Sequence, residues 1–194
     1  MPNLIVRELK DRKGESYVVR QATPADAAQV LAFIDRVCHE ASEFLLMEPG
    51  EVYFTVDDET DYLTRLFYAD NSLGLIAQRH GEIVGFLNFD GGQRRKVRHA
   101  GEFGMSVRQS HWGLGIGGSL IDLLIEWAAA SHVVRKVNLR VFANNDRGMR
   151  LYRSRGFVEE GRLSRQIFHD GRYLDEILMS RWVGNAVDAE AVSQ

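Results

Sequence analysis

Four glycines within the six residues Gly113–Gly118 are the feature that most constrains how this chain folds. They follow a strand predicted over 97–107 and begin a helix predicted over about 115–131. A helix start presents unpaired N–H groups and the positive end of the helix dipole, and glycine lets a phosphate approach that backbone closely. We therefore predict that the turn holds the pyrophosphate of a nucleotide-containing coenzyme; the alternative is a turn that only redirects the chain. The predicted contacts are Gly113, Leu114, Gly115, Ile116, Gly117 and Gly118.

Composition limits the kind of protein. The 194 residues are 45% hydrophobic and 26% charged, which allows one substantial core and an ordinary surface. The net charge of −3 argues against general nucleic-acid binding. Since the chain lacks a signal-like start and any run of 18 apolar residues, we expect a cytoplasmic protein without membrane contact. We expect one domain over 1–183 and a disordered tail over 184–194.

The element pattern predicts a mixed sheet with helices on it. Apolar alternation and helical spacing indicate hairpins and helices first, then a strand–helix–strand–helix unit, then a closing hairpin. The expected segments are a hairpin over 4–19, helices from Thr23 and over 57–69, a hairpin over 73–87, strands over 97–107 and 136–142, helices over 115–131 and 145–155, and a final hairpin around Asp170-Gly171.

The glycine turn also matches a dinucleotide fingerprint. Gly113, Gly115 and Gly118 satisfy G-x-G-x-x-G. That fingerprint requires a strand running directly into the turn and an acidic residue about 20 positions later. Here a polar run over 108–111 separates strand from turn, and Asp146 comes too late. A P-loop is excluded because no Gly-Lys-Ser/Thr follows.

The turn instead resembles the coenzyme A loop of the GNAT family of N-acetyltransferases, a Q/R-x-x-G-x-G/A pattern after a strand ending in valine. Val107 ends the strand and Gly115-Ile116-Gly117 supplies the G-x-G, while Trp112 stands where the family usually has Gln or Arg. A second motif is similar to the family's N-x-x-A-x-x-L-Y…G-F, with glycine in place of alanine. Its residues are Asn145, Gly148, Leu151, Tyr152, Gly156 and Phe157. The resemblance covers about residues 17–183.

This resemblance implies a single-domain GNAT-like α/β fold, with a central, mostly antiparallel sheet of about seven strands and about four helices. It also implies an N-acetyltransferase that uses acetyl-CoA. The backbone of Met105, Ser106 and Val107 is implied to pair with the pantetheine arm like an added strand. Asn145 is implied to bond the same arm, although it could equally be a helix cap. Tyr152 occupies the position of the family's tyrosine that protonates the coenzyme thiolate; the alternative is a core aromatic.

A candidate general base comes from the alternation of the strand over 97–107. Side chains expected to face the core are Val97, Phe103, Met105 and Val107. Those expected on the other face are Ala100, Glu102, Gly104 and Ser106. A carboxylate among small residues marks a face that a ligand can approach, so Glu102 is the candidate base, directly or through a water, as in some members of the resembled family. The alternative is a strand-edge salt bridge.

The acceptor is expected in the N-terminal half, where an acidic region follows the first helix. Such a field favours a cationic amine of a small molecule or peptide, although solvated helix ends explain the same charges. The acidic residues are Glu40, Glu43, Glu48, Glu51, Asp57, Asp58 and Glu59. Six histidines without metal-ligand spacing imply no metal, and the lone Cys38 is expected to be a buried small hydrophobe.

Two other functions stay open at this point. One is a module that binds acyl-CoA without turnover, and the other is a dinucleotide-binding oxidoreductase. The oligomeric state is open as well, although a homodimer is common in the resembled family.

Overall fold

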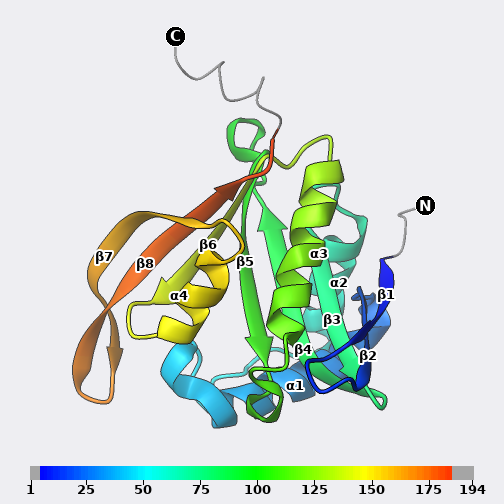
Figure 1. The fold of residues 1–194 in the computed structure, drawn as a ribbon, viewed down its shortest axis with the longest axis horizontal. Coiled ribbons are helices and arrows are strands. Elements are labelled where there is room, and N and C mark those ends of the chain that lie inside the picture. The colour runs from blue at the N-terminus through cyan, green and yellow to red at the C-terminus, as the bar shows by residue number, and fades with distance from the viewer. Residues whose placement is uncertain (1–4, 185–194) are drawn as a thin grey trace.

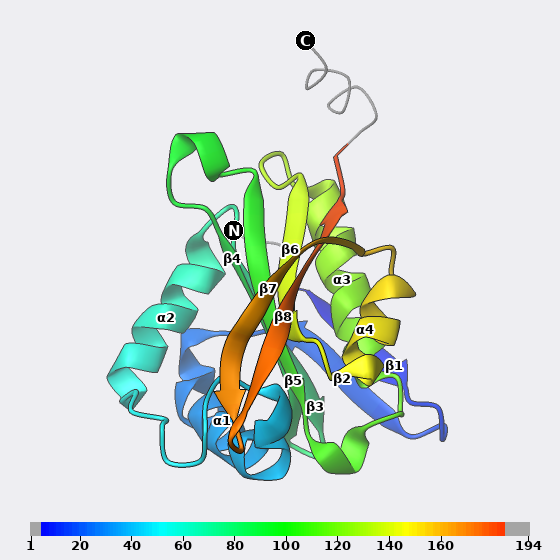
Figure 2. The same cartoon turned by 90° about the vertical axis from the view of Figure 1, so that its left-hand side faces the viewer.

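The structure is a computed structural model that describes residues 5–184, which form one eight-stranded sheet with helices on both faces (Figures 1 and 2). In chain order the strands are β1 (Val6–Lys10), β2 (Ser16–Gln21), β3 (Leu73–Arg79), β4 (Glu82–Gly91), β5 (Ala100–Val107), β6 (Lys136–Phe142), β7 (Val158–His169) and β8 (Arg172–Trp182). The α-helices are α1 (Ala27–Ala41), α2 (Val56–Tyr68), α3 (Ile116–Ala130) and α4 (Asp146–Arg153). The expected α/β fold is confirmed, with one strand more than expected.

The sheet is antiparallel except at one pair of neighbouring strands, and it splits at that pair. The strand order is β1-β2-β3-β4-β5-β6-β8-β7, and among these described strands only β5 and β6 run parallel. Their pairing runs only from Ala100↔Lys136 to Glu102↔Asn138, although both strands continue. Figure 1 shows β6 turning away from β5 toward α4. The sheet is therefore split between these two strands beyond Glu102.

Each face of the sheet has its own hydrophobic core, because successive strand residues point to opposite faces. Helices α1 and α2 cover one face, with Leu63 and Phe86 in its core. Helices α3 and α4 cover the other face, with Phe89 and Leu120 in its core. Figure 2 shows the two helix pairs on opposite sides of the sheet. The split between β5 and β6 is therefore an opening from one face of the sheet to the other.

The helix starts follow local capping chemistry. The Thr55 hydroxyl accepts the Asp58 N–H at 3.1 Å, and the Asp58 carboxylate accepts the Thr55 N–H at 2.9 Å. This capping box starts α2 at Val56. No α-helix in the described part of the chain is long and apolar enough to span a membrane.

Two expectations need correction or fall outside the described part. β5 begins at Ala100, because residues Arg95–Val97 form a 3₁₀ turn closed by the Val97 N–H and the Arg94 carbonyl at 2.9 Å. Val97 is 49% exposed there, so the expectation that it faces the core is wrong. The expected tail over 184–194 lies outside the described residues beyond Gly184.

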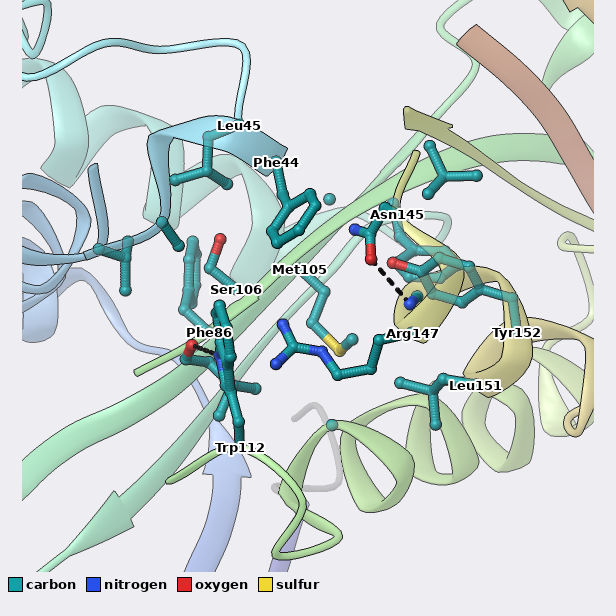
Figure 3. Close-up of a pocket in the computed structure, with 18 of the residues that line it drawn as sticks. Phe44, Leu45, Phe86, Met105, Ser106, Trp112, Asn145, Arg147, Leu151 and Tyr152 are labelled. Atoms are coloured by element: carbon teal, nitrogen blue, oxygen red, sulfur yellow. Dashed lines mark hydrogen bonds between the residues drawn. The ribbon is translucent and has the colours of Figure 1, made fainter. Parts of the chain in front are cut away.

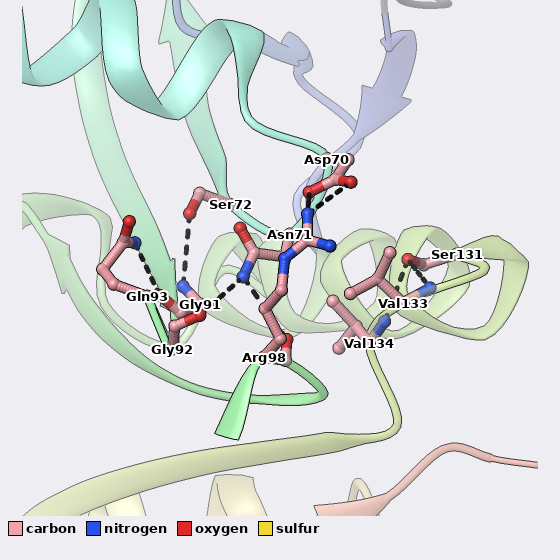
Figure 4. Close-up of polar contacts among 10 residues, drawn as sticks. All are labelled: Asp70, Asn71, Ser72, Gly91, Gly92, Gln93, Arg98, Ser131, Val133 and Val134. Atoms are coloured by element: carbon pink, nitrogen blue, oxygen red, sulfur yellow. Dashed lines mark hydrogen bonds and ion pairs between the residues drawn. The ribbon is translucent and has the colours of Figure 1, made fainter. Parts of the chain in front are cut away.

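A buried asparagine holds the loop between β4 and β5 (Figure 4). Asn71 Nδ2 donates to the carbonyls of Gly92 at 3.1 Å and Arg98 at 3.3 Å, and the Ser72 hydroxyl accepts the Gly91 N–H at 3.2 Å. A Cβ on Gly91 would collide with the Asn71 carbonyl oxygen, so the close approach requires glycine. This packing fixes the end of β4 and the start of β5, the strand that carries Glu102.

We expect Asn71→Ala to lower the free energy of unfolding by about 2 kcal/mol, because two carbonyls lose their donor. Gln93→Ala is the matched control, since this exposed side chain donates only one hydrogen bond, to the Gly91 carbonyl. Its effect should stay within about 0.5 kcal/mol. Urea unfolding followed by circular dichroism measures both, and equal losses would show that Asn71 does not hold the loop.

Candidate functional site

A cavity of about 830 Å³ lies at the split and takes its walls from both faces of the sheet. The sequence-predicted residues that line it are Glu102, Met105, Ser106, Val107, Gly113, Gly115, Ile116, Gly117, Gly118, Asn145 and Tyr152. Leu114 does not line it and packs against the core of α3 instead. The structure therefore brings all but one of the predicted site residues together.

The glycine turn has the geometry that only glycine adopts readily. A 3₁₀ turn over Gln109–His111 follows β5, and Gly113 and Gly115 then have φ of 77° and 95°. Gly115 is the N-cap of α3, and no described side chain caps this helix start. The N–H groups of the first turn of α3 are thus available to an anion.

The β1–β2 hairpin supports the turn from behind. The Arg12 N–H donates to the Leu114 carbonyl at 3.1 Å, and its guanidinium donates to the Gly113 carbonyl at 3.3 Å. Arg12 also lines the cavity. No sequence pattern indicated this residue, because it lies about 100 positions before the turn that it contacts.

Close packing explains the next two glycines. A Cβ on Gly117 would meet Met105 Cε at 3.3 Å, and a Cβ on Gly118 would collide with Arg155 Nη2. Arg155 is held over the first turn of α3 by Asp122, with Nε and Oδ1 3.3 Å apart. These glycines let α3 lie directly against β5 and α4.

The backbone of β5 presents an open edge to the split. The Arg108 N–H donates to the Val84 carbonyl at 3.0 Å, and hydrogen-bonded pairs alternate along an antiparallel ladder. By this alternation Ser106, opposite Phe86, faces β4 with its backbone, whereas Met105 and Val107 face the split. Ser106 therefore reaches the cavity through its side chain.

Trp112 binds one of the backbone groups of β5 that face the split. Its indole N–H donates to the Val107 carbonyl at 2.7 Å. The guanidinium of Arg147, from α4, lies 3.2 Å from the centre of the Trp112 ring, and Figure 3 shows Arg147 reaching across the cavity toward it. This cation–π stack joins α4 to the glycine turn across the split.

Tyr152 and Asn145 lie on the α4 side of the cavity (Figure 3). Tyr152 is 8% exposed, and its ring packs edge to face on Phe103 and Phe157, with ring centres 5.9 and 6.2 Å apart. Burial raises the pKa of the Tyr152 phenol to about 12. Asn145 Oδ1 accepts the Gly148 N–H at 2.8 Å, so the expected helix cap is present and Nδ2 is left for another partner.

Glu102 lines the cavity and also forms the salt bridge that was the alternative for it. Its Oε2 lies 3.1 Å from Arg140 Nε, and its side chain is 49% exposed. Arg140 Nη1 lies 3.5 Å from Oε2 of Glu176, whose side chain is only 4% exposed. Glu176 and Arg140 both line the cavity, and sequence analysis missed them because nothing local pairs β6 with β8.

The acidic residues between Glu40, in the last turn of α1, and Glu59, in α2, do not line the cavity. Glu40 pairs with Arg108 at 2.7 Å, and Glu48 Oε1 lies 2.9 Å from His169 Nδ1. Glu59 is buried with no described partner for Oε1, and burial raises its pKa to about 7. Cys38 is buried as expected, although it also lines the cavity. The negative charge at the site comes from other carboxylates.

Comparisons with known proteins agree with this geometry. The model of the Acetyltransferase (GNAT) family matches residues 37–157. An L-amino acid N-acetyltransferase of Escherichia coli is 30% identical over 107 residues, which are 55% of this chain and 66% of that protein. Spermidine N(1)-acetyltransferase of Vibrio cholerae is 30% identical over 94 residues, 46% of this chain and 54% of that protein. The chain thus spans about half to two thirds of the length of these curated relatives.

A solved structure matches over more of the chain. The crystal structure of a GNAT-family acetyltransferase from Streptococcus pneumoniae is 32% identical and superposes with a TM-score of 0.83. The match covers 87% of this chain and 99% of that one.

Proposed function

This chain belongs to the Acetyltransferase (GNAT) family, and we propose that it is an N-acetyltransferase that moves an acetyl group from acetyl-CoA directly to a primary amine of a small molecule or peptide. The observation that carries the proposal is the cavity through the split sheet. An uncapped helix start lies on one side of this cavity, and carboxylates lie on the other.

The residues on the α3 side fit acetyl-CoA. The first-turn N–H groups of α3 suit a pyrophosphate, and Arg12, Arg150 and Arg155 add positive charge near it. Met105 offers its backbone N–H and carbonyl at the open edge of β5, which suits the amides of a pantetheine arm. Nδ2 of Asn145 is a further donor to that arm. When bound, acetyl-CoA supplies an activated acyl group as a thioester.

The chemistry requires two proton movements by this chain. Glu102 takes a proton from the acceptor nitrogen, directly or through a water, so that the nitrogen can attack the acetyl carbonyl carbon. The new C–N bond forms as the C–S bond breaks, and the Tyr152 hydroxyl donates a proton to the departing sulfur. The second proton that the nitrogen must lose to become an amide restores the Tyr152 hydroxyl, and Glu102 returns the first proton to solvent. Because burial keeps the Tyr152 phenol protonated, it holds this proton at the working pH.

Amine-dependent thiol release tests the proposal. We expect acetyl-CoA together with a panel of primary amines to give free thiol, detected with a thiol reagent, and an acetylated amine, detected by mass spectrometry. Acetyl-CoA binding without thiol release from any amine would favour the non-catalytic binding module. Binding of NADH and not of acetyl-CoA would favour the oxidoreductase.

A further inference from the structure

The half of the cavity opposite α3 combines an apolar wall with a small charged group. Ser106, Arg140 and Glu176 lie on the face of the sheet that α1 and α2 cover, the same face as Phe86. Helix α1 and the 3₁₀ turn after it, Ser42–Phe44, add Phe33, Phe44 and further aliphatic side chains to this wall. Figure 3 shows Phe44, Leu45 and Phe86 gathered on this side of the cavity.

The charged group carries more negative than positive charge. Glu102 and Glu176 share the one guanidinium of Arg140, at 3.1 and 3.5 Å. Asp90, which also lines this half, is already neutralised by Arg65 at 2.5 Å and accepts the Tyr62 hydroxyl at 2.7 Å. One net negative charge therefore remains beside the apolar wall.

Apart from Arg147, the other arginines of the cavity besides Arg140 lie on the α3 side, which we propose holds the coenzyme. Among the lining residues that the structure describes, the other arginines besides Arg140 lie on the β1–β2 turn, on α4 or just after it: Arg12, Arg147, Arg150 and Arg155. Arg147 reaches across the cavity, where its guanidinium is stacked on the Trp112 ring. Arg140 is already paired with two carboxylates, so its positive charge is offset before an acceptor carboxylate reaches it. The carboxylate of an acceptor brought to this half of the cavity would be repelled by Glu102 and Glu176.

We propose, building on the acetyltransferase function above, that the acceptor is an amine with an apolar substituent and no free carboxylate. Its ammonium group lies against Glu176 and Glu102 before it loses a proton, and its apolar substituent packs against Phe33, Phe44 and Phe86. An amine of this chemistry is either a small arylalkyl or alkyl amine or the N-terminus of a peptide, whose carboxyl group is an amide. A free amino acid is disfavoured by the same charges.

Three acceptors that share one ring test the charge argument. Phenylethylamine, phenylalaninamide and phenylalanine are compared by kcat/KM for thiol release, taken as pH-independent limits because their amines differ in basicity. We expect phenylalanine to be poorer than phenylalaninamide by about a hundredfold. The order of phenylethylamine and phenylalaninamide then separates a small amine from a peptide N-terminus. Equal values for phenylalanine and its amide would overturn the proposal.

A variant and a second comparison complete the test. Glu176→Gln keeps the side-chain shape and removes the charge, so the discrimination against phenylalanine should fall at least about tenfold while the Kd of acetyl-CoA is unchanged. If this variant fails to fold, the comparison on the unaltered chain still decides. Ethylamine and spermidine test the apolar wall, and either one outperforming phenylethylamine overturns that part.

Failure of this inference differs from failure of the proposed function. If the protein acetylates phenylalanine in preference to its amide, the function stands and the acceptor class is wrong. If acetyl-CoA binds but no amine releases thiol, the proposed transferase function fails, and the acceptor inference fails with it.

Discussion

Replacing Tyr152 with phenylalanine is expected to lower kcat by about 10²–10⁴-fold while the Kd of acetyl-CoA stays nearly unchanged. The ring of Tyr152 packs edge to face on Phe103 and Phe157, and phenylalanine preserves these contacts while removing only the hydroxyl. Steady-state thiol release measures kcat, and isothermal titration calorimetry measures Kd. Tyr173→Phe is the matched control, because that side chain is 67% exposed at the β7–β8 hairpin and should leave kcat unchanged.

The pKa of Tyr152 gives this prediction a pH signature. Burial raises it to about 12, so the phenol is protonated through the neutral and mildly alkaline range and the acid form is lost only as pH approaches that value. The rate of the unaltered protein should therefore not fall on account of Tyr152 between about pH 7 and 10. Full turnover by Tyr152→Phe would remove the acid role. An alkaline fall near pH 9 that the variant lacks would contradict a buried, protonated phenol.

Replacing Gly115 with alanine should weaken acetyl-CoA binding at least about tenfold, which corresponds to about 1.4 kcal/mol. Gly115 has a φ of 95°, where an L side chain is strained by about 1–3 kcal/mol, and relief of that strain moves the helix start whose N–H groups face the cavity. Titration calorimetry with acetyl-CoA measures the loss.

Gly81→Ala separates this effect from strain in general. Gly81 lies in the β3–β4 turn with a φ of 84°, and a Cβ added there would meet open space, as it would at the turn glycine Gly171. Its substitution should cost similar stability and leave the Kd of acetyl-CoA unchanged. Equal losses of affinity in Gly81→Ala and Gly115→Ala would show that the glycine turn has no special part in binding.

Local patterns predicted the elements of this fold and the site residues on the glycine turn, β5 and α4. The glycine turn, the alternation along β5 and the helix that begins after Asn145 each depend on residues close together in the sequence, so spacing alone indicated them. The start of β5 was misplaced because a 3₁₀ turn and an exposed Val97 look locally like strand.

The rest of the site depends on contacts between distant segments. Glu102 meets Arg140 because β5 and β6 pair in parallel, and Arg140 meets Glu176 because β8 inserts between β6 and β7. No local spacing encodes that strand order. Trp112, which departs from the family pattern, was equally unplaced, since its partners are the Val107 carbonyl and an arginine of α4.

Because the cavity opens on two faces of one sheet, its two walls come from different segments of the chain. The apolar wall that we propose receives the acceptor comes largely from α1 and the turn after it, whereas the wall that we propose holds the coenzyme comes from the glycine turn and α4, more than 60 residues later. Under the proposed function, substitutions in the first segment are expected to change which amine is accepted. The two walls still meet at Phe44 and Trp112, whose ring centres lie 6.3 Å apart, and at Glu40, which accepts the Gln109 N–H at 2.9 Å. Exchanging residues 33–47 between relatives is therefore expected to alter acceptor preference, and exchanges that keep Glu40 and Phe44 are expected to leave the Kd of acetyl-CoA unchanged.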